Sequence, residues 1–239
     1  MDDKTCLPLG QVCFRNRFVF LFVSILVVIV VSPIAESLAP LRILFSIFIT
    51  VVILSATYAL SHRRRDLIIA MVLACPALGF TWASDAAESP FLFLASHVAS
   101  MLFFIFVVQH MLIFIWQQDE VSVDLIVGAA VVYLLMAVIW AYVYLTVETL
   151  KPGSFSVSEE HSLSARQLFM YYSLVTISTL GYGDITPTTN IAGSFSVLEA
   201  VIGQLYLVTT VAWLVGVHVS RSGGRGFHPR NGNNGKSIR

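Results

Sequence analysis

The chain has little charge. Only 12% of its 239 residues are Asp, Glu, Lys or Arg, whereas 57% are hydrophobic. A soluble domain of this length carries roughly twice that charged fraction, so the composition excludes an ordinary soluble domain and indicates a membrane protein. The formal net charge is zero. A strongly basic surface is therefore missing, and we expect no nucleic-acid partner.

Cysteine is also scarce. The three cysteines, Cys6, Cys13 and Cys75, follow no CxxC spacing, and two of them precede the first long apolar run. Neither disulfides nor a zinc site are predicted, and free cysteines of small apolar character are expected. No phosphate-binding loop, dinucleotide fingerprint or ordered catalytic triad is present. We therefore predict that the chain is not an enzyme and has no resident cofactor.

Long apolar runs make up most of the sequence. Crossing a bilayer as a helix takes about 20 mostly apolar residues. The third run is the shortest and contains Pro76, which is tolerated in a spanning helix where neighbours satisfy the freed carbonyl. The sequence predicts an all-α membrane protein with six transmembrane helices. The predicted spans are 18–35, 41–60, 67–83, 91–116, 125–150 and 191–219.

Lysine and arginine predict the orientation of these spans, because such residues concentrate in cytoplasmic loops. Basic residues precede the first span, lie between the second and third, and follow the sixth. The opposite loops carry only Arg42, Lys151 and Arg166. Both termini are therefore predicted to be cytoplasmic, as segments 1–17 and 221–239.

The C-terminal segment is short and rich in Gly, Asn and Arg. This composition predicts a disordered tail that contacts anionic membrane lipid through its bases. Its length leaves no room for a folded ligand-binding module. We therefore expect no soluble regulatory domain in this chain.

The long connection between the fifth and sixth spans contains the stretch Thr-Ile-Ser-Thr-Leu-Gly-Tyr-Gly-Asp, residues 176–184. A cation that crosses a membrane must exchange its water shell for protein oxygens, which backbone carbonyls can supply. The carbonyls point inward in successive rings if ordinary and left-handed backbone alternate, which Gly181 and Gly183 permit. Irregular backbone at membrane depth must be buried in protein or line a water-filled path, so a re-entrant loop is predicted.

Residues 179–183, Thr-Leu-Gly-Tyr-Gly, resemble the potassium-channel signature, whose Thr-Val-Gly-Tyr-Gly form makes a selectivity filter. Residues 125–219 are similar to the two-helix pore domain of tetrameric potassium channels, with an outer helix, a re-entrant pore helix, a filter and an inner helix. The resemblance implies a pore domain over 125–220 and a homotetramer, because one chain supplies one filter loop. It also implies potassium binding at the filter, formed by Thr179, Leu180, Gly181, Tyr182 and Gly183, with the ions held at the first four.

A short pore helix is predicted before the filter, opened by a capping box at 164–167 and ending near Ser178. Tyr171 and Tyr172 lie near its middle. We expect them to form an aromatic collar around Tyr182, the alternative being a place at the membrane interface.

Three residues after the filter fall at family-like spacing. Asp184 matches the acidic residue, Pro187 a turn proline and Gly203 the inner-helix hinge glycine, although glycine in a spanning helix also serves close packing. Some family members pair the acidic residue with a pore-helix glutamate, but Val175 occupies that position here. Tyr171 is the predicted partner of Asp184 instead.

The sixth span contains an ionisable residue, Glu199, one helical turn before Gly203. Such a residue in a membrane span is a functional hypothesis by default. We favour a role in which Glu199 supports the filter from behind, bound to pore-helix backbone donors; the alternative is that it faces the cavity. The ungapped match to the family predicts that four residues line the cavity: Gln204, Leu207, Val211 and Val215.

The first four spans, residues 18–116, form a predicted four-helix domain without sensor charges. The fourth span contains His97 and His110 but no Lys or Arg. Voltage sensing needs several charges that move through the field, so weak or absent voltage dependence is expected. The two histidines lie 13 residues apart, which is not a ligand spacing, and packing or interfacial roles are expected for them.

The favoured function is passive, potassium-selective conduction in the cell membrane, and the compact loops resemble those of bacterial inner-membrane channels. A non-selective cation channel and a non-conducting membrane scaffold remain alternatives. A transporter subunit is disfavoured, because related transporters carry four filter loops in one chain.

Overall fold

The computed structural model describes residues 17–36, 42–60, 64–87, 89–118, 121–158 and 164–224. Within these ranges the chain is helical apart from one small sheet and its loops. Residues 1–16 of the predicted N-terminal segment, most of the predicted tail, Cys6 and Cys13 lie outside the described residues. The helices are α2 Arg17–Glu36, α3 Arg42–Ala59, α4 Arg64–Ala87, α5 Pro90–Trp116, α6 Val123–Leu150, α7 Ala165–Ile177 and α8 Asn190–Gly224, and the strands are β1 Phe155–Val157 and β2 Ile185–Pro187.

Each predicted span coincides with one helix. In the described part of the chain, α4, α5, α6 and most of α8 are long and apolar enough to cross a membrane, while α2 and α3 provide the shorter apolar stretches 18–31 and 46–59. Continuous runs of aliphatic and aromatic side chains explain these helices, because backbone groups in an apolar setting must be satisfied internally. The described part of the chain is thus almost entirely helical, with helices of membrane type.

Two boundaries differ from the prediction. The third span extends to the 24 residues of α4, with Pro76 inside the helix and Arg64 in its first turn. The helix α8 continues to Gly224, so the first residues of the predicted tail are helical. Hydrophobicity marks where a helix can be buried, whereas the helix itself ends where its backbone hydrogen bonds end.

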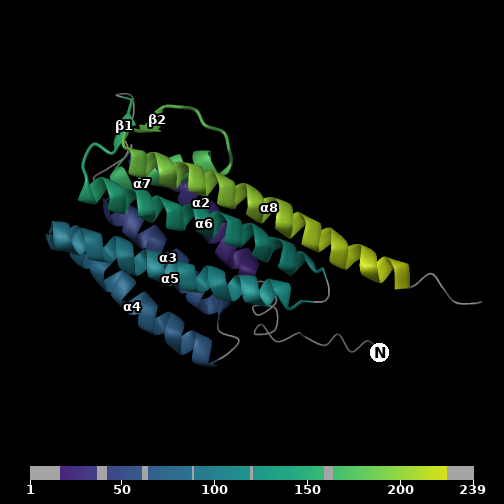
Figure 1. Ribbon diagram of the computed structural model, residues 1–239. Coiled ribbons are helices and arrows are strands. Elements are labelled where there is room, and N and C mark those ends of the chain that lie inside the picture. Colours follow the sequence, from purple (N-terminus) through teal and green to yellow (C-terminus); the bar gives the residue numbers. More distant parts are fainter. Residues whose placement is uncertain are drawn as a thin grey trace, which may run out of the picture.

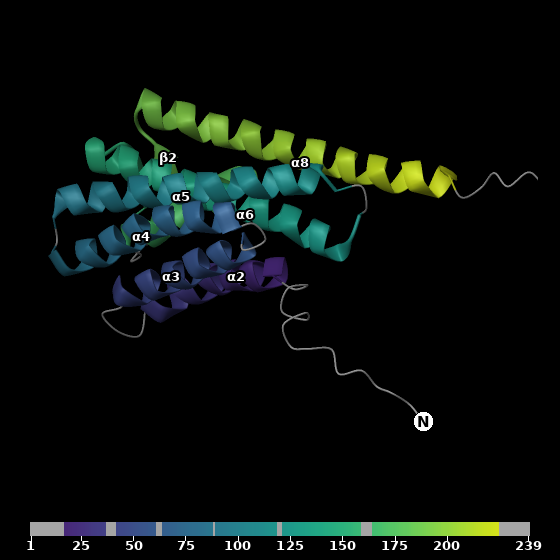
Figure 2. The ribbon, with the colours of Figure 1, turned by 90° about the horizontal axis from the view of Figure 1, so that it is seen from below.

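The helices form a bundle whose long axes run in a similar direction (Figure 1). In the bundle, α2 packs on α3, α4 on α3 and α5, and α6 on α2 and α5. The helix α8 lies along α6 and α7, on the opposite side of the bundle from α3 (Figure 2). The C-terminal part of α8 extends beyond the ends of the neighbouring helices (Figure 1). The α6–α8 part is therefore covered by the other helices on one side only.

The core lies between α2, α3, α5, α6 and α7. Its fully buried large side chains include Leu21, Ile53, Phe103, Leu135 and Tyr144. By contrast, α8 exposes a largely apolar surface. Its exposed residues include Val197, Val201, Leu205, Val208, Val211 and Val219.

The strands β1 and β2 pair in antiparallel register, with Ser156 opposite Thr186. Beyond the strands, the Thr188 amide donates to the Ser154 carbonyl at 2.9 Å. The pairing joins the segment after α6 to the segment before α8 at the same end of the bundle as α7 (Figure 1). The pairing therefore fixes the C-terminal end of the loop formed by residues 178–184, because β2 begins at the next residue.

Candidate functional site

The loop that follows α7 carries the filter-like sequence. Backbone hydrogen bonds fold it back over the end of the helix: the Thr179 amide donates to the Thr176 carbonyl at 3.0 Å, and the Leu180 amide to the Val175 carbonyl at 3.0 Å. The bounds of α7 match the predicted helix. Ser164 is its N-cap residue in extended conformation, but the Ser164 side chain makes no capping hydrogen bond, so the predicted capping box is not formed.

The backbone of the loop alternates between two conformations. Thr179, Gly181 and Gly183 have φ of 60°, 57° and 80°, and no other non-glycine residue than Thr179 has positive φ in the described part of the chain. Leu180 and Tyr182 between them therefore have ordinary backbone. This is the alternation that can turn successive carbonyls toward one side of the chain, and it was predicted for the two glycines.

The positive φ of Thr179 was not predicted from the sequence, although Thr179 was predicted to be a filter residue. A β-branched residue at positive φ is a genuine outlier, at a cost of about 1–3 kcal/mol. Such strain persists only where the surrounding structure imposes it, which is common at functional sites. The period of two set by Gly183 and Gly181, extended one step backwards, would have indicated Thr179.

Tyr171 and Asp184 connect α7 to the end of the loop. The Tyr171 hydroxyl donates to Asp184 Oδ2 at 2.7 Å, which is the contact predicted from the sequence. The Ile185 amide donates to Asp184 Oδ1 at 3.1 Å. Burial, and then the hydrogen bond and charge of Asp184, raise the pKa of Tyr171 to about 12, so the hydroxyl keeps its proton at neutral pH.

Of the two tyrosines of the predicted collar around Tyr182, Tyr172 contacts α6, β1 and α8 within the chain. The Tyr172 hydroxyl lies 2.7 Å from Ser196 Oγ on α8. The Tyr172 ring packs at 5.0 Å from the Tyr144 ring and 5.4 Å from that of Phe155. The Tyr172 hydroxyl thus has a hydrogen-bond partner and its ring is packed against other aromatic rings. Tyr182, by contrast, is 66% exposed.

Glu199 is fully buried between α6, α7 and α8. It accepts hydrogen bonds from the Tyr144 hydroxyl on α6 and the Ser173 hydroxyl on α7. This arrangement favours the supporting role over the cavity-facing one. The donors differ from the prediction, because they are side-chain hydroxyls rather than pore-helix backbone amides: the backbone amides of α7 are engaged within the helix.

Gly203 on α8 packs against Ile177, the last residue of α7. A Cβ atom at this position would lie 2.5 Å from Ile177 Cγ1 and 3.2 Å from the Ile177 carbonyl oxygen. The helix α8 runs without interruption through Gly203. Of the two roles considered, close packing is therefore the one that this conformation supports. The same Ile177 carbonyl accepts a hydrogen bond from the Tyr133 hydroxyl at 2.9 Å.

The four predicted cavity residues lie on the uncovered side of α8. Gln204, Leu207, Val211 and Val215 are all exposed in the single chain. Leu205 and Val208 are exposed too, so exposure alone does not separate a cavity face from its neighbours. Pro187 is the last residue of β2.

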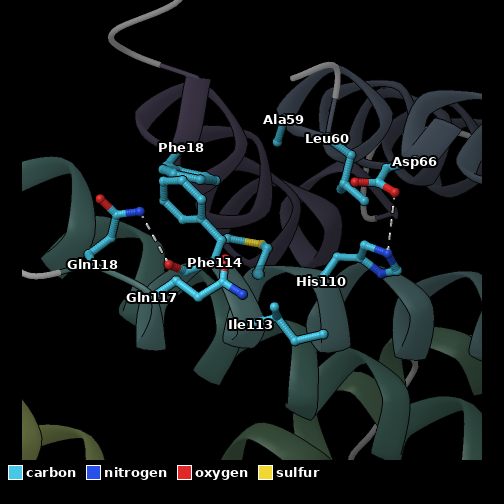
Figure 3. Close-up of a pocket in the computed structure, with 10 residues that line it drawn as sticks. Phe18, Ala59, Leu60, Asp66, His110, Ile113, Phe114, Gln117 and Gln118 are labelled. Atoms are coloured by element: carbon cyan, nitrogen blue, oxygen red, sulfur yellow. Dashed lines mark hydrogen bonds and ion pairs between the residues drawn. The ribbon is translucent and has the colours of Figure 1, made fainter. Parts of the chain in front are cut away.

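The two histidines of α5 have different surroundings. His97 is buried, and its ring packs at 5.7 Å from the Phe93 ring and 6.0 Å from the Tyr142 ring. His110 Nε2 lies 3.8 Å from Asp66 Oδ1 (Figure 3). This pair lies at the edge of a cavity of about 360 Å³ between the ends of α2, α3, α4 and α5. No residue of the 178–184 loop lines this cavity.

Comparison with known proteins identifies the class of the C-terminal part. Residues 121–218, which comprise α6, α7, the loop and nearly all of α8, match the family model described as "Ion channel". No curated protein and no solved structure matches the chain. The match confirms the predicted resemblance to the channel family over this segment. Together with the apolar helices, it indicates an integral membrane protein that carries an ion-channel domain, a class that is generally non-enzymatic.

Proposed function

We propose that the chain is one subunit of a passive, potassium-selective channel that conducts through residues 179–183. The observation that carries the proposal is the alternation of positive φ at Thr179, Gly181 and Gly183. It occurs directly after a short helix, within the segment that matches the ion channel family. A loop that served only as a connection would have no need to hold a threonine in the left-handed region.

In this proposal, potassium sheds its water and is held by the carbonyl oxygens of Thr179, Leu180, Gly181 and Tyr182, with the Thr179 hydroxyl as a further ring. The helix α7 acts as the pore helix. Its C-terminal end lies next to the loop, and the negative end of a helix dipole favours a cation. The permeant ion is the cargo of the protein, and no resident cofactor is required.

Four copies of the chain are needed to close such a filter. The uncovered apolar surface of α8 and the exposure of Leu180, at 58%, and of Tyr182, at 66%, support assembly around the loop. Channels of this family typically assemble as oligomers. We propose a homotetramer in which Gln204, Leu207, Val211 and Val215 line the cavity, and in which membrane lipid covers the outer helices.

The proposed topology has six spans with α7 and the loop as a re-entrant segment, both termini in the cytoplasm, and a bacterial inner membrane as the location. The helix bounds and the distribution of basic residues support it. Residues 18–116 form the N-terminal four-helix domain and residues 125–220 the pore domain. The helix α5 contains no Lys or Arg, and each charge that crosses the field contributes only about 2.3 kcal/mol per 100 mV, so we propose that opening is not voltage-driven.

The test is ion flux into liposomes that contain the purified full chain. Potassium flux that excludes sodium supports the proposal. Flux of both ions supports a non-selective cation channel, and no flux supports a non-conducting scaffold.

Substitution of Gly181 by alanine makes the test specific for the loop. Gly79 in α4 is the matched control, because a Cβ meets nothing within 4 Å at either position, whereas only Gly181 has positive φ. We expect Gly181→Ala to abolish potassium flux and Gly79→Ala to leave it unchanged. Undiminished flux in Gly181→Ala would show that the ions do not cross at this loop.

A further inference from the structure

A buried ion pair joins the pore domain to the N-terminal four-helix domain. Arg166, the second residue of α7, is 8% exposed. Its Nη1 lies 3.0 Å from Asp85 Oδ1, in the last turn of α4. The sequence analysis used Arg166 only as a basic residue of the long connection, because nothing local indicates a partner 81 residues away.

Residues from three helices of the N-terminal domain surround this guanidinium. Nη2 donates to Ser84 Oγ on α4 at 3.1 Å, and Nη1 lies 3.3 Å from Ser46 Oγ on α3. The Arg166 Cζ atom lies 5.0 Å from the centre of the Phe93 ring on α5, within cation–π range. The Ser46 hydroxyl also donates to the second carboxylate oxygen of Asp85. Both terminal nitrogens of the Arg166 guanidinium are therefore engaged.

Both charges are placed against the preference of their own helices. A cation is unfavourable near a helix N-terminus and an anion near a helix C-terminus, because of the helix dipole. Arg166 is at the N-terminus of α7, and Asp85 is at the C-terminus of α4. Each charge is instead favourable next to the other helix: Arg166 lies by the C-terminus of α4, and Asp85 by the N-terminus of α7. A buried pair also gains little net stability, since desolvation offsets the attraction.

The position of the N-terminus of α7 affects the position of the filter, because α7 is short and continuous. Its 13 residues span roughly 20 Å at 1.5 Å per residue, and the loop is hydrogen-bonded to its last turn. A tilt at Arg166 would therefore shift Thr179 and the carbonyls that follow. Tyr171 on the same helix binds Asp184 at the other end of the loop, so both ends of the loop would follow such a tilt.

We infer that Arg166 and Asp85 are positioning residues for the filter, and that the N-terminal four-helix domain holds the outer end of the pore helix through them. The role rests on the proposed conduction through residues 179–183. It gives the N-terminal domain a task that needs no voltage-sensing charge.

The experiment compares Asp85→Asn with Asp66→Asn in the full chain, by sodium and potassium flux into the same liposomes. Asp66 is a matched control: it also lies on α4 and pairs with a base on another helix, His110 at 3.8 Å (Figure 3), but at the opposite end of α4. The readout is the ratio of sodium to potassium flux. This ratio does not depend on how many channels have folded, so a general loss of stability does not change it.

We expect Asp85→Asn to raise the ratio of sodium to potassium flux by at least about fivefold, which is the smallest effect typical of energetic coupling between two sites. Asp66→Asn should leave the ratio at the wild-type value. Arg166→Lys keeps the charge but not the fork, and should give an intermediate ratio. If Asp85→Asn does not assemble, Ser84→Ala removes one contact of the guanidinium and leaves the ion pair; a raised ratio is expected there too. An unchanged ratio in the conducting variants, or an equal rise in Asp66→Asn, would overturn the inference.

Hydrogen exchange separates a failure of this inference from a failure of the proposed function. If the wild-type chain conducts no ions, the proposed function fails, but amide exchange of residues 165–177 still reports how firmly α7 is held. Faster exchange there in Asp85→Asn than in Asp66→Asn supports the anchoring of α7. Equal exchange in the two variants contradicts it.

Discussion

Replacing Gly203 with alanine tests the packing of α8 against the end of α7. The new Cβ would lie 2.5 Å from Ile177 Cγ1 and 3.2 Å from the Ile177 carbonyl oxygen. Carbon atoms in ordinary contact are about 3.5–4.0 Å apart, so either the helices separate or Ile177 changes its rotamer. Ile177 is fully buried and its carbonyl is held by Tyr133, so neither adjustment is free.

The expected magnitude combines two terms. Overpacking a well-packed site costs about 1–3 kcal/mol, while the exchange of glycine for alanine inside a helix gains about 1 kcal/mol. Gly216 provides the control, because it lies on the same helix and a Cβ there meets nothing within 4 Å. The gain is common to both variants. Gly203→Ala should therefore be less stable than Gly216→Ala by about 1–3 kcal/mol.

The assay is the free energy of unfolding of the purified protein in mixed micelles titrated with SDS, at one protomer concentration, because assembly makes stability depend on concentration. The double variant Ile177→Ala/Gly203→Ala removes Cγ1 and should recover part of the loss, which a double-mutant cycle measures as coupling. Equal stability of Gly203→Ala and Gly216→Ala, or no coupling to Ile177, would refute the packing role and return Gly203 to the hinge hypothesis.

Two further predictions concern the contacts of α7. In Tyr171→Phe the hydrogen bond that joins α7 to Asp184 at the end of the loop is lost. We expect the potassium flux, measured as a function of time in liposomes, to decay faster than in the wild type. The pKa of Tyr171 is raised to about 12 in the folded protein. The contribution of the bond is therefore fully present below the ordinary value of about 10 and is lost as the pH rises through about 12. If the difference in flux decay between Tyr171→Phe and the wild type disappeared between pH 7 and 9, this reasoning would be wrong. In Glu199→Gln the hydroxyls of Tyr144 and Ser173 face an amide with one acceptor oxygen instead of a carboxyl group with two, so at least one of the two hydrogen bonds is lost, worth about 0.5–1.5 kcal/mol. We expect a lower melting temperature of the assembly with unchanged single-channel conductance, and a changed conductance at unchanged stability would assign Glu199 to the cavity.

The helices were predictable because the signal that defines them is local. Runs of about 20 apolar residues give a spanning helix whatever lies next to them, and each predicted span coincides with a helix. The loop after α7 was predictable for a similar reason, since Gly181 and Gly183 carry their conformational freedom in the residue type itself. Thr179 carries no such mark, and its positive φ is imposed by the structure around it.

The contacts of α7 were predictable only where sequence neighbours limit the choice. Tyr171 and Asp184 are 13 positions apart, on either side of a short loop, so few partners were available to Asp184. Glu199 and Tyr144 are separated by 55 positions, and Arg166 and Asp85 by 81. An all-round apolar helix gives no periodicity that shows which face meets which neighbour. The hydroxyl donors to Glu199 and the partner of Arg166 therefore had to come from the structure.

These contacts hold α7 at three positions along its length. Arg166 fixes its N-terminal end against α4, Ser173 joins its middle to Glu199 on α8, and Ile177 fits against Gly203 at its C-terminal end. Two of the three therefore involve α8 and one involves the N-terminal four-helix domain. In the proposed channel, α8 thus contacts the pore helix through Glu199 and Gly203, whereas the N-terminal domain contacts it through Arg166. The two sets of contacts can be tested separately, because Asp85→Asn removes an ion-pair partner from the second set and no residue from the first.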